Sequence, residues 1–344
     1  MIHLKRYPLL ITLCAAALML CAAPARSVQA DESRPAPEKS SSGFQTNAEN
    51  RISGTWKSRD AESESQTMEF TDVYGEVHTL TIDPTAPMHN YDASCWILVD
   101  QDMYYTDSGR YTSRLGIDVS FYQGDIDWAS VKAAGYEFAF IRLGYRGYGR
   151  SGSLTVDSRF QSNLQGAKDA GLEVGVYFFS QAISESEAAE EAAFVIDKLN
   201  GTQLDLPIVY DPEFILDGEG NKISSARTST LTGEQITQNT LAFCQAVETA
   251  GYEAAFYSNM LSESEVFDMT ALADYTVWYA DYNALPQTPY DFTFWQYTDA
   301  GSVAGIEGNV DLNIQLIPVE SFESAESTLT VIPEFCPPTE ETTG

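Results

Sequence analysis

The chain is poor in histidine. Its 344 residues include three, His3, His78 and His89, and none lies beyond residue 89. The rest of the chain therefore cannot form a Ser-His-Asp triad or a histidine-rich metal centre. If that part is an enzyme, its protons must be moved by carboxylates or, less readily, by tyrosine or a thiol.

Basic residues are also scarce. Lysine and arginine total 19 against 50 aspartate and glutamate residues, which gives a formal net charge of −31. A surface this acidic repels phosphate backbones over a Debye length, so we expect no nucleic acid partner. The composition is otherwise globular, with 44% hydrophobic and 20% charged residues, which excludes a fully disordered chain.

The N-terminus has the pattern of an export signal. Lys5 and Arg6 precede an apolar run over residues 9–23, and Val28-Gln29-Ala30 is a plausible cleavage site. This run is shorter than the roughly 20 residues that a bilayer-spanning helix needs. We predict a signal peptide over residues 1–30 and an extracellular protein. The alternative is an uncleaved anchor that tethers the chain to a membrane.

Five cysteines are present, and removal of the signal peptide leaves Cys95, Cys244 and Cys336. Cys244 lies in an expected helix over residues 235–250 and is predicted to be a small core residue. Cys95 and Cys336 flank the main domain and are the better candidates for one disulfide, although the sequence alone does not establish that bond. A catalytic cysteine would need a base nearby, and no histidine is available.

Composition shifts divide the mature chain. Residues 31–66 are rich in Ser, Glu, Pro and Asn and predict a flexible linker. Residues 67–112 carry β-branched and aromatic residues between turn signals and predict a small β module. The module is too short for a large core of its own, so we expect it to pack on the domain that follows, residues 113–318. Residues 319–344 read as a polar tail.

Strands and helices alternate through residues 113–318. Helices are expected after the N-cap residues Asp127, Asp157, Ser184 and Thr232. Short apolar strands are expected at 115–119, 138–143, 174–179, 206–210, 254–257, 276–280 and 292–297. This pattern predicts an α/β fold, an irregular TIM-barrel-like (β/α) barrel rather than an open sheet. No helix is expected between the last two of these strands.

Acidic residues follow several of these strands. The predicted strand ends carry Asp118, Asp211, Asp281 and Asp311, and Glu213 follows Asp211 by two positions. Residues two apart in extended backbone share a face, with Cα atoms about 6.6–6.8 Å apart. Repulsion between two such carboxylates would raise the pKa of one of them, which suits glycoside cleavage by one acid and one anion. The alternative is a pair of solvated acids, and the spacing does not choose between retention and inversion.

Aromatic residues near the strand ends suit stacking on sugar faces. The candidate substrate-binding residues, with Asp281, are Tyr145, Tyr177, Tyr257, Trp278 and Trp295. For about half of such residues, core packing is the alternative explanation.

Several segments together resemble the glycoside hydrolase family 25 lysozymes. They are residues 116–120 (GIDVS), 206–213 (LPIVYDPE), 295–297 (WQY) and 310–313 (VDLN), and the likeness extends over about residues 115–318. The resemblance implies an N-acetylmuramidase on an irregular α/β barrel that needs no metal or cofactor. Its substrate would be the glycan strands of peptidoglycan, cut at the β-1,4 bond between N-acetylmuramic acid and N-acetylglucosamine at the cell wall.

The resemblance also implies roles for four acids. Glu213 would be the general acid, and Asp211 either a stabilising anion or the group that orients the substrate acetamido. Asp118 and Asp311 would shape the cleft and hold the sugar or water. Two other functions stay open: a non-catalytic binder of wall glycans, and another β-glycan hydrolase such as a chitinase. We also hypothesise that the β module positions the barrel at the wall or membrane.

Overall fold

The computed structural model describes residues 66–72, 75–107, 109–217 and 221–319. The predicted signal peptide or anchor, residues 31–65 of the predicted linker and residues 320–344 of the predicted tail lie outside the described residues. Cys336 does too, so its pairing with Cys95 stays a prediction. Among the described residues, no helix is both long and apolar enough to cross a membrane.

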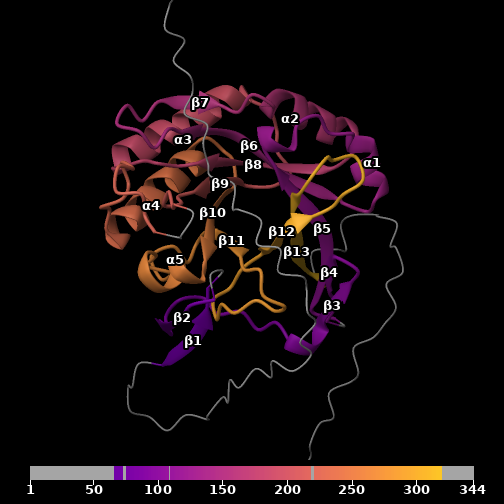
Figure 1. The fold of residues 1–344 in the computed structure, drawn as a ribbon, viewed down its shortest axis with the longest axis horizontal. Helices are drawn as coiled ribbons and strands as arrows, with labels where there is room; N and C mark the ends of the chain where they lie inside the picture. The colour runs from indigo at the N-terminus through magenta and orange to yellow at the C-terminus, as the bar shows by residue number, and fades with distance from the viewer. Residues whose placement is uncertain (1–65, 73–74, 108, 218–220, 320–344) are drawn as a thin grey trace, which may run out of the picture. The chain divides into compact units, whose positions relative to one another are not determined.

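Within the described residues, eight strands close into a barrel (Figure 1). Around the barrel they are β5 (Tyr111–Val119), β6 (Phe138–Arg146), β8 (Glu173–Phe179), β9 (Ile208–Asp211), β10 (Ala254–Asn259), β11 (Thr276–Ala280), β12 (Phe294–Gly301) and β13 (Val310–Pro318). Neighbours from β5 to β12 are parallel, whereas β13 is antiparallel to both β12 and β5 and closes the sheet. A short strand, β7 (Leu154–Val156), pairs antiparallel with the end of β6.

The fold prediction is confirmed in part. Each of the seven predicted strands is present, and the architecture is a mixed eight-stranded barrel. Helices do not alternate throughout: in the described chain no α-helix separates β11, β12 and β13. The helices are α1 (Trp128–Ala133), α2 (Phe160–Asp169), α3 (Glu185–Leu199), α4 (Gly233–Thr249) and α5 (Met260–Glu265), with 3-10 turns η1 (Ala93–Cys95) and η2 (Phe121–Gln123).

Three of the four predicted N-caps are confirmed. The side chains of Asp127, Ser184 and Thr232 accept hydrogen bonds from the first turns of α1, α3 and α4. The prediction for Asp157 is wrong, because the cap of α2 is Arg159, which makes no side-chain capping bond. Asp157 Oδ1 accepts from the backbone N–H of Arg159, while Oδ2 pairs with Arg142 on β6, since a buried guanidinium needs a counter-charge.

Side-chain alternation gives the barrel two apolar layers. The inward cluster consists of Phe138, Phe140, Tyr177, Leu206, Val209, Ala255, Trp278 and Phe294. Outward residues, such as Ile117, Tyr210 and Leu312, join the larger core, which also includes helix residues. Gly116 is required inside, because a Cβ there would lie 2.2 Å from the Phe138 ring.

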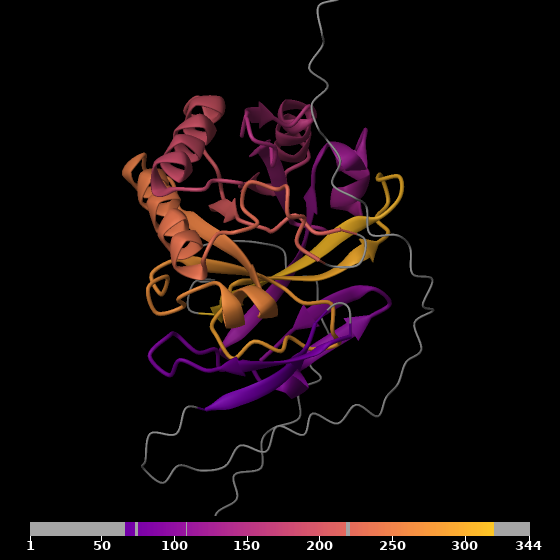
Figure 2. The same cartoon turned by 60° about the vertical axis from the view of Figure 1, so that its left-hand side comes forward.

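The segment preceding β5 packs on the barrel. It contains two hairpins, β1 (Thr67–Thr71) with β2 (Val77–Thr81) and β3 (Trp96–Val99) with β4 (Asp102–Tyr105). Because β5 begins at Tyr111, the last two residues of the predicted β module belong to the barrel, and we keep the name β module for its described residues 67–72, 75–107 and 109–110. The Trp96 ring lies 5.0 Å from that of Trp295 on β12, and Thr71 exchanges two backbone hydrogen bonds with the Gln287 side chain. Figures 1 and 2 show the module on the side of the barrel opposite α2–α4. It thus covers strands that no helix covers.

Candidate active site

Strand direction brings the predicted acids to one end of the barrel. Asp118 and Asp211 lie at the C-terminal ends of the parallel strands β5 and β9. Asp311 lies at the beginning of β13, not at a strand end, but β13 runs the opposite way. Its Cα therefore pairs directly with that of Asp118. Because β13 is antiparallel to β5, its first residues lie at the end of the barrel where β5 and β9 finish, and Asp311 joins the other two acids there. We call this end of the barrel the mouth.

The alternation along each strand turns these acids inward. Ile117 and Val119 belong to the outer core, so Asp118 between them faces the interior. Val209 belongs to the inner cluster, so Asp211, two residues later, also faces inward. Glu213 follows two residues beyond β9 and is partly exposed.

Tyr177 lies among these charges. Its ring belongs to the inner cluster, and its hydroxyl interacts electrostatically with Arg142, Asp118, Asp211 and Asp311. Burial, followed by the influence of the three acids, raises the pKa of Tyr177 well above its ordinary value, while Arg142 acts in the opposite direction. The phenol is therefore a neutral hydrogen-bonding group inside the mouth.

Two amides hold Asp118. Gln296 Nε2 and Asn313 Nδ2 donate to Asp118 Oδ2 at 2.7 and 2.8 Å. The orientation of Asn313 is defined because the Trp278 indole can only donate, and it does so to Asn313 Oδ1 at 2.8 Å. Two donors on one oxygen hold the Asp118 side chain in one orientation. Asp118 is thus a fixed, buried carboxylate.

Gln296 connects this carboxylate with two tyrosines. Its Oε1 accepts from the hydroxyls of Tyr257 and Tyr282, each at 2.9 Å. The Tyr282 side chain is 40% exposed, whereas Tyr257 is largely covered. The network therefore runs from the solvent at the rim to the buried acid.

Arg142 is a buried cation at the same mouth. Its Nε donates to Asp157 Oδ2 at 2.7 Å, and its guanidinium carbon lies 5.0–5.5 Å from the ring centres of Phe121, Tyr122 and Tyr145. Tyr145 thus lies at the mouth with its ring near Arg142, and its contact with substrate stays a prediction. Tyr122 is 47% exposed beside it.

Three predicted substrate-binding residues are not presented to solvent. Trp278 is fully buried in the barrel, and its indole holds Asn313 in place by a hydrogen bond. Trp295 faces outward and is covered by Trp96, because Gln296 occupies the inward position next to it. Asp281 is buried and accepts from Tyr279 and from the backbone of Gln287, so it organises the loop after β11. These positions correct the predicted contacts with substrate.

The described residues contain one group of side chains spaced to ligate a metal, and it includes none of the acids at the barrel mouth. Asp72, Glu76 and His78, at the β1–β2 hairpin, offer ligand atoms within 4.8 Å of one another. His78 Nε2 and Asp72 Oδ2 lie 2.9 Å apart and bond to each other. The acids at the barrel mouth form no such group.

Comparison with known sequences decides the family. The profile of the glycosyl hydrolases family 25 matches residues 117–306, more than half of the chain. The chain belongs to glycosyl hydrolase family 25. The match contains Asp118, Asp211 and Glu213, and Asp311 lies just beyond it.

Individual relatives agree with this assignment. The autolytic lysozyme of Clostridium acetobutylicum is 28% identical over 199 residues, which cover 58% of this chain and 54% of the relative. Lysozyme M1 of Streptomyces globisporus is 32% identical over 206 residues, which cover 58% and 66%. The chain thus spans less than two thirds of either relative. The modular autolysin LytC of Streptococcus pneumoniae, solved with a synthetic peptidoglycan ligand, is similar in fold, with a TM-score of 0.53, 20% identity and coverage of 72% of this chain and 56% of LytC.

Sequence reasoning missed three polar residues of this family 25 site as site residues. Gln296 and Asn313 lie inside the segments that carry the family resemblance, Gln296 next to Trp295 and Asn313 two positions after Asp311. Arg142 interrupts the apolar first part of β6, residues 138–143. A charge in a buried strand needs a partner, so the position of Arg142 in an apolar segment could have marked it as part of a polar site.

Proposed function

We propose that this family 25 chain is a peptidoglycan hydrolase. It acts as an N-acetylmuramidase that cleaves the β-1,4 bond between N-acetylmuramic acid and N-acetylglucosamine. The observation that carries the proposal is the convergence of Asp118, Asp211 and Asp311 at the mouth of a closed barrel. Glu213 follows Asp211 by two residues. The lysozyme names of the two relatives support the same substrate class.

The two acids of the β9 segment divide the chemistry. Glu213, at the partly exposed position, protonates the leaving oxygen of the glycosidic bond. Asp211, buried and facing inward, stabilises the positive charge that develops on the sugar ring or orients the 2-acetamido group for attack. Both routes need an anion at this position.

Asp118 and Asp311 shape the cleft. The Asp118 carboxylate is held by Gln296 and Asn313, so it offers the substrate an acceptor at a fixed position. Tyr177, Tyr257 and Tyr145 supply aromatic surface and hydroxyls to the sugar, and the exposed Tyr122 and Tyr282 extend this surface outward. Trp278, Trp295 and Asp281 support these groups from behind.

The cellular setting belongs to the same proposal. An export signal over residues 1–30 would deliver the enzyme to the extracellular side, where it would act on the cell wall. We also classify the barrel with the irregular (β/α) barrels, because α1 to α5 lie in five of its strand connections.

The decisive experiment is digestion of purified peptidoglycan by the wild type and by Glu213→Gln, with the new ends reduced and identified. We expect muramic acid ends from the wild type and a rate lower by about 10²–10⁴-fold in the variant. Glu185→Gln, an exposed glutamate on α3, is the matched control. Glucosamine ends would identify a glucosaminidase. Binding to the wall without cleavage would identify a glycan-binding protein, and equal rates in the two proteins would reject Glu213 as the acid.

A further inference from the structure

Two consecutive residues after β8 hold the main chain of the two acids of β9. Ser180 N donates to the Asp211 carbonyl at 2.8 Å, and Gln181 Nε2 donates to the Glu213 carbonyl at 2.6 Å. The ladder between β8 and β9 ends at Asp211, opposite Phe179, and the ladder between β9 and β10 ends at Tyr210. Glu213 thus lies two residues past the ladder, and the Gln181 side chain provides a bond that the sheet does not.

Gln181 is itself fixed. It is fully buried, and its Nε2 also donates to the Ser180 carbonyl at 2.8 Å. Because the Ser180 and Glu213 carbonyls can only accept, they determine the orientation of the amide, and its Oε1 accepts from Thr228 Oγ1 at 2.8 Å. Both ends of this amide are therefore engaged, and rotation would break three hydrogen bonds.

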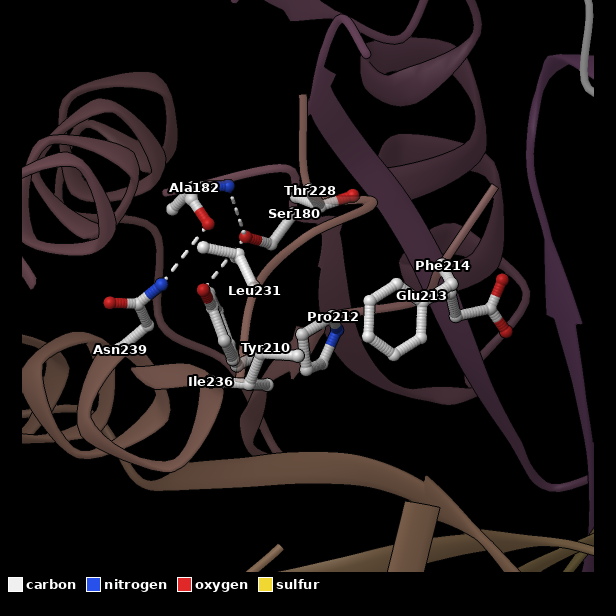
Figure 3. A pocket seen from close by; sticks show the side chains of 10 residues that line it. All are labelled: Ser180, Ala182, Tyr210, Pro212, Glu213, Phe214, Thr228, Leu231, Ile236 and Asn239. Carbon is white, nitrogen blue, oxygen red and sulfur yellow. Dashed lines mark hydrogen bonds between the residues drawn. The ribbon is translucent and has the colours of Figure 1, made fainter. Parts of the chain in front are cut away.

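Ser180 is held from the opposite side. Its Oγ lies 2.6 Å from Glu191 Oε2 and 2.8 Å from the Tyr210 hydroxyl, and Glu191 Oε1 accepts from Arg146 Nε at 2.7 Å. Asn239 on α4 donates to the Ala182 carbonyl. Figure 3 shows Ser180, Ala182, Tyr210 and Asn239 joined in this way on one side of Pro212, while the Glu213 carboxylate points to the other side.

We propose that Gln181 is a positioning residue for the reaction: by holding the Glu213 carbonyl it places the carboxyl of that residue at the glycosidic oxygen. This inference rests on the proposed function. A general acid acts only within hydrogen-bond reach of the oxygen that it protonates, and a displacement of about 1 Å can cost about 10²-fold in rate. Gln181 lies behind the acid and does not touch the substrate.

The kinetic test uses Gln181→Ala and Gln181→Glu on the full chain with purified peptidoglycan. We expect kcat to fall about 10–100-fold in both, with KM within about 2-fold of the wild type, because ground-state binding is unchanged. Gln245→Glu, the same chemical change at an exposed position on α4, is the control and should leave both constants unchanged. An unchanged kcat, or a raised KM with unchanged kcat, would overturn the inference.

The pH profile separates positioning from general damage. In Gln181→Glu an ionised carboxylate faces the Glu213 and Ser180 carbonyls, so it repels them, whereas its protonated form can donate. Activity of this variant relative to the wild type should therefore recover as the pH falls. The wild type must be measured over the same range, since burial raises the pKa of the neighbouring Glu191 to about 7. Parallel profiles would contradict the proposal.

A crystallographic arm makes the test independent of the substrate. In Gln181→Ala the main chain of Glu213 should shift while Asp118 and Gln296 stay in place. If the alanine variant does not fold, Thr228→Val replaces it in this experiment. That substitution removes only the hydrogen bond to Gln181 Oε1, so we expect a smaller displacement of Glu213 in the same direction. An unmoved Glu213 would overturn the inference. A wild type inactive on peptidoglycan would overturn the proposed function instead, and the structures would still decide the role of Gln181.

Discussion

The mouth of the barrel and the face beneath the β module are built from adjacent residues of the same strands. On β12, Gln296 points inward and binds Asp118, while Trp295 next to it points outward and packs on Trp96. The mouth is polar and densely hydrogen bonded, whereas the module face is a cluster of aromatic rings. A strand of period two can thus serve chemistry on one side and stability on the other.

This difference changes how the β module is viewed. The hypothesis that it positions the enzyme at the wall stays a prediction, but its packing indicates a structural contribution. The module lies against the outer face of β12 and β13, where Trp96 packs on Trp295 and β4 contacts β13. Deleting the module to test wall binding would therefore also expose this part of the core.

The largest effect is expected on the module face. Trp295→Ala removes a fully buried indole that also donates to the Asp281 carbonyl, and should cost about 3–5 kcal/mol of unfolding free energy. Urea denaturation would measure this loss. Trp295→Phe should cost less, and the rate per folded molecule should stay within an order of magnitude. A loss of cleavage rate in Trp295→Ala without a loss of unfolding free energy would contradict the assignment of stability to the module face and of activity to the mouth.

At the mouth, Asp118→Asn should have the complementary effect. Its oxygen can still accept from Gln296 and Asn313, so the fold should be retained while the negative charge is lost. We expect a fall in the peptidoglycan cleavage rate of about 10²–10³-fold. Asp197→Asn, at an exposed position, serves as the control. A melting temperature lowered along with the rate would indicate that Asp118 is mainly structural.

Glu263 is a buried acid on α5, the helix that contacts β2 of the module, and it should make the stability of the protein depend on pH. Burial raises its pKa to about 8 from an ordinary 4.5, although hydrogen bonds from Thr288 and Ser258 lower it, and the charge of Asp281 adds a smaller increase. Because the folded value is the higher one, its stabilising contribution is complete below about pH 4.5 and is lost as the pH rises through about 8. Glu263→Gln should flatten this decline by more than about 1.4 kcal/mol, the equivalent of one pKa unit. Denaturation at pH 5 and pH 9 would measure it, and an unchanged slope would contradict it.

The smallest effect is expected for Tyr257→Phe. The variant loses one donor to Gln296 while Tyr282 still supplies the other, so the amide should keep its orientation. A loss of about 0.5–1.5 kcal/mol in transition-state stabilisation would appear as a few-fold lower kcat/KM. Tyr252→Phe, which lies elsewhere and bonds the Thr202 carbonyl, is the control. A loss as large as that of Asp118→Asn would assign Tyr257 a direct role in the reaction.

Several predictions from the sequence survive because their signals are local. The seven strands appear as apolar runs, and the caps Asp127, Ser184 and Thr232 announce helices through neighbouring residues. Asp157 has the same local signal, yet the helix cap lies at Arg159, and one oxygen of the Asp157 carboxylate pairs with Arg142, fifteen positions away. Trp295 was expected at the substrate because its direction on β12 was not known.

The sequence by itself determined the family and the strand-forming segments and predicted the site acids, since short-range periodicity and motif spacing are properties of the chain. The tertiary structure alone decided that β13 returns antiparallel and sets Asp311 beside Asp118. It also decided that Gln296 rather than Trp295 faces the mouth, and that Gln181 reaches the Glu213 carbonyl. Strand direction, register and contacts across dozens of residues depend on how the whole sheet closes, and no local pattern encodes them.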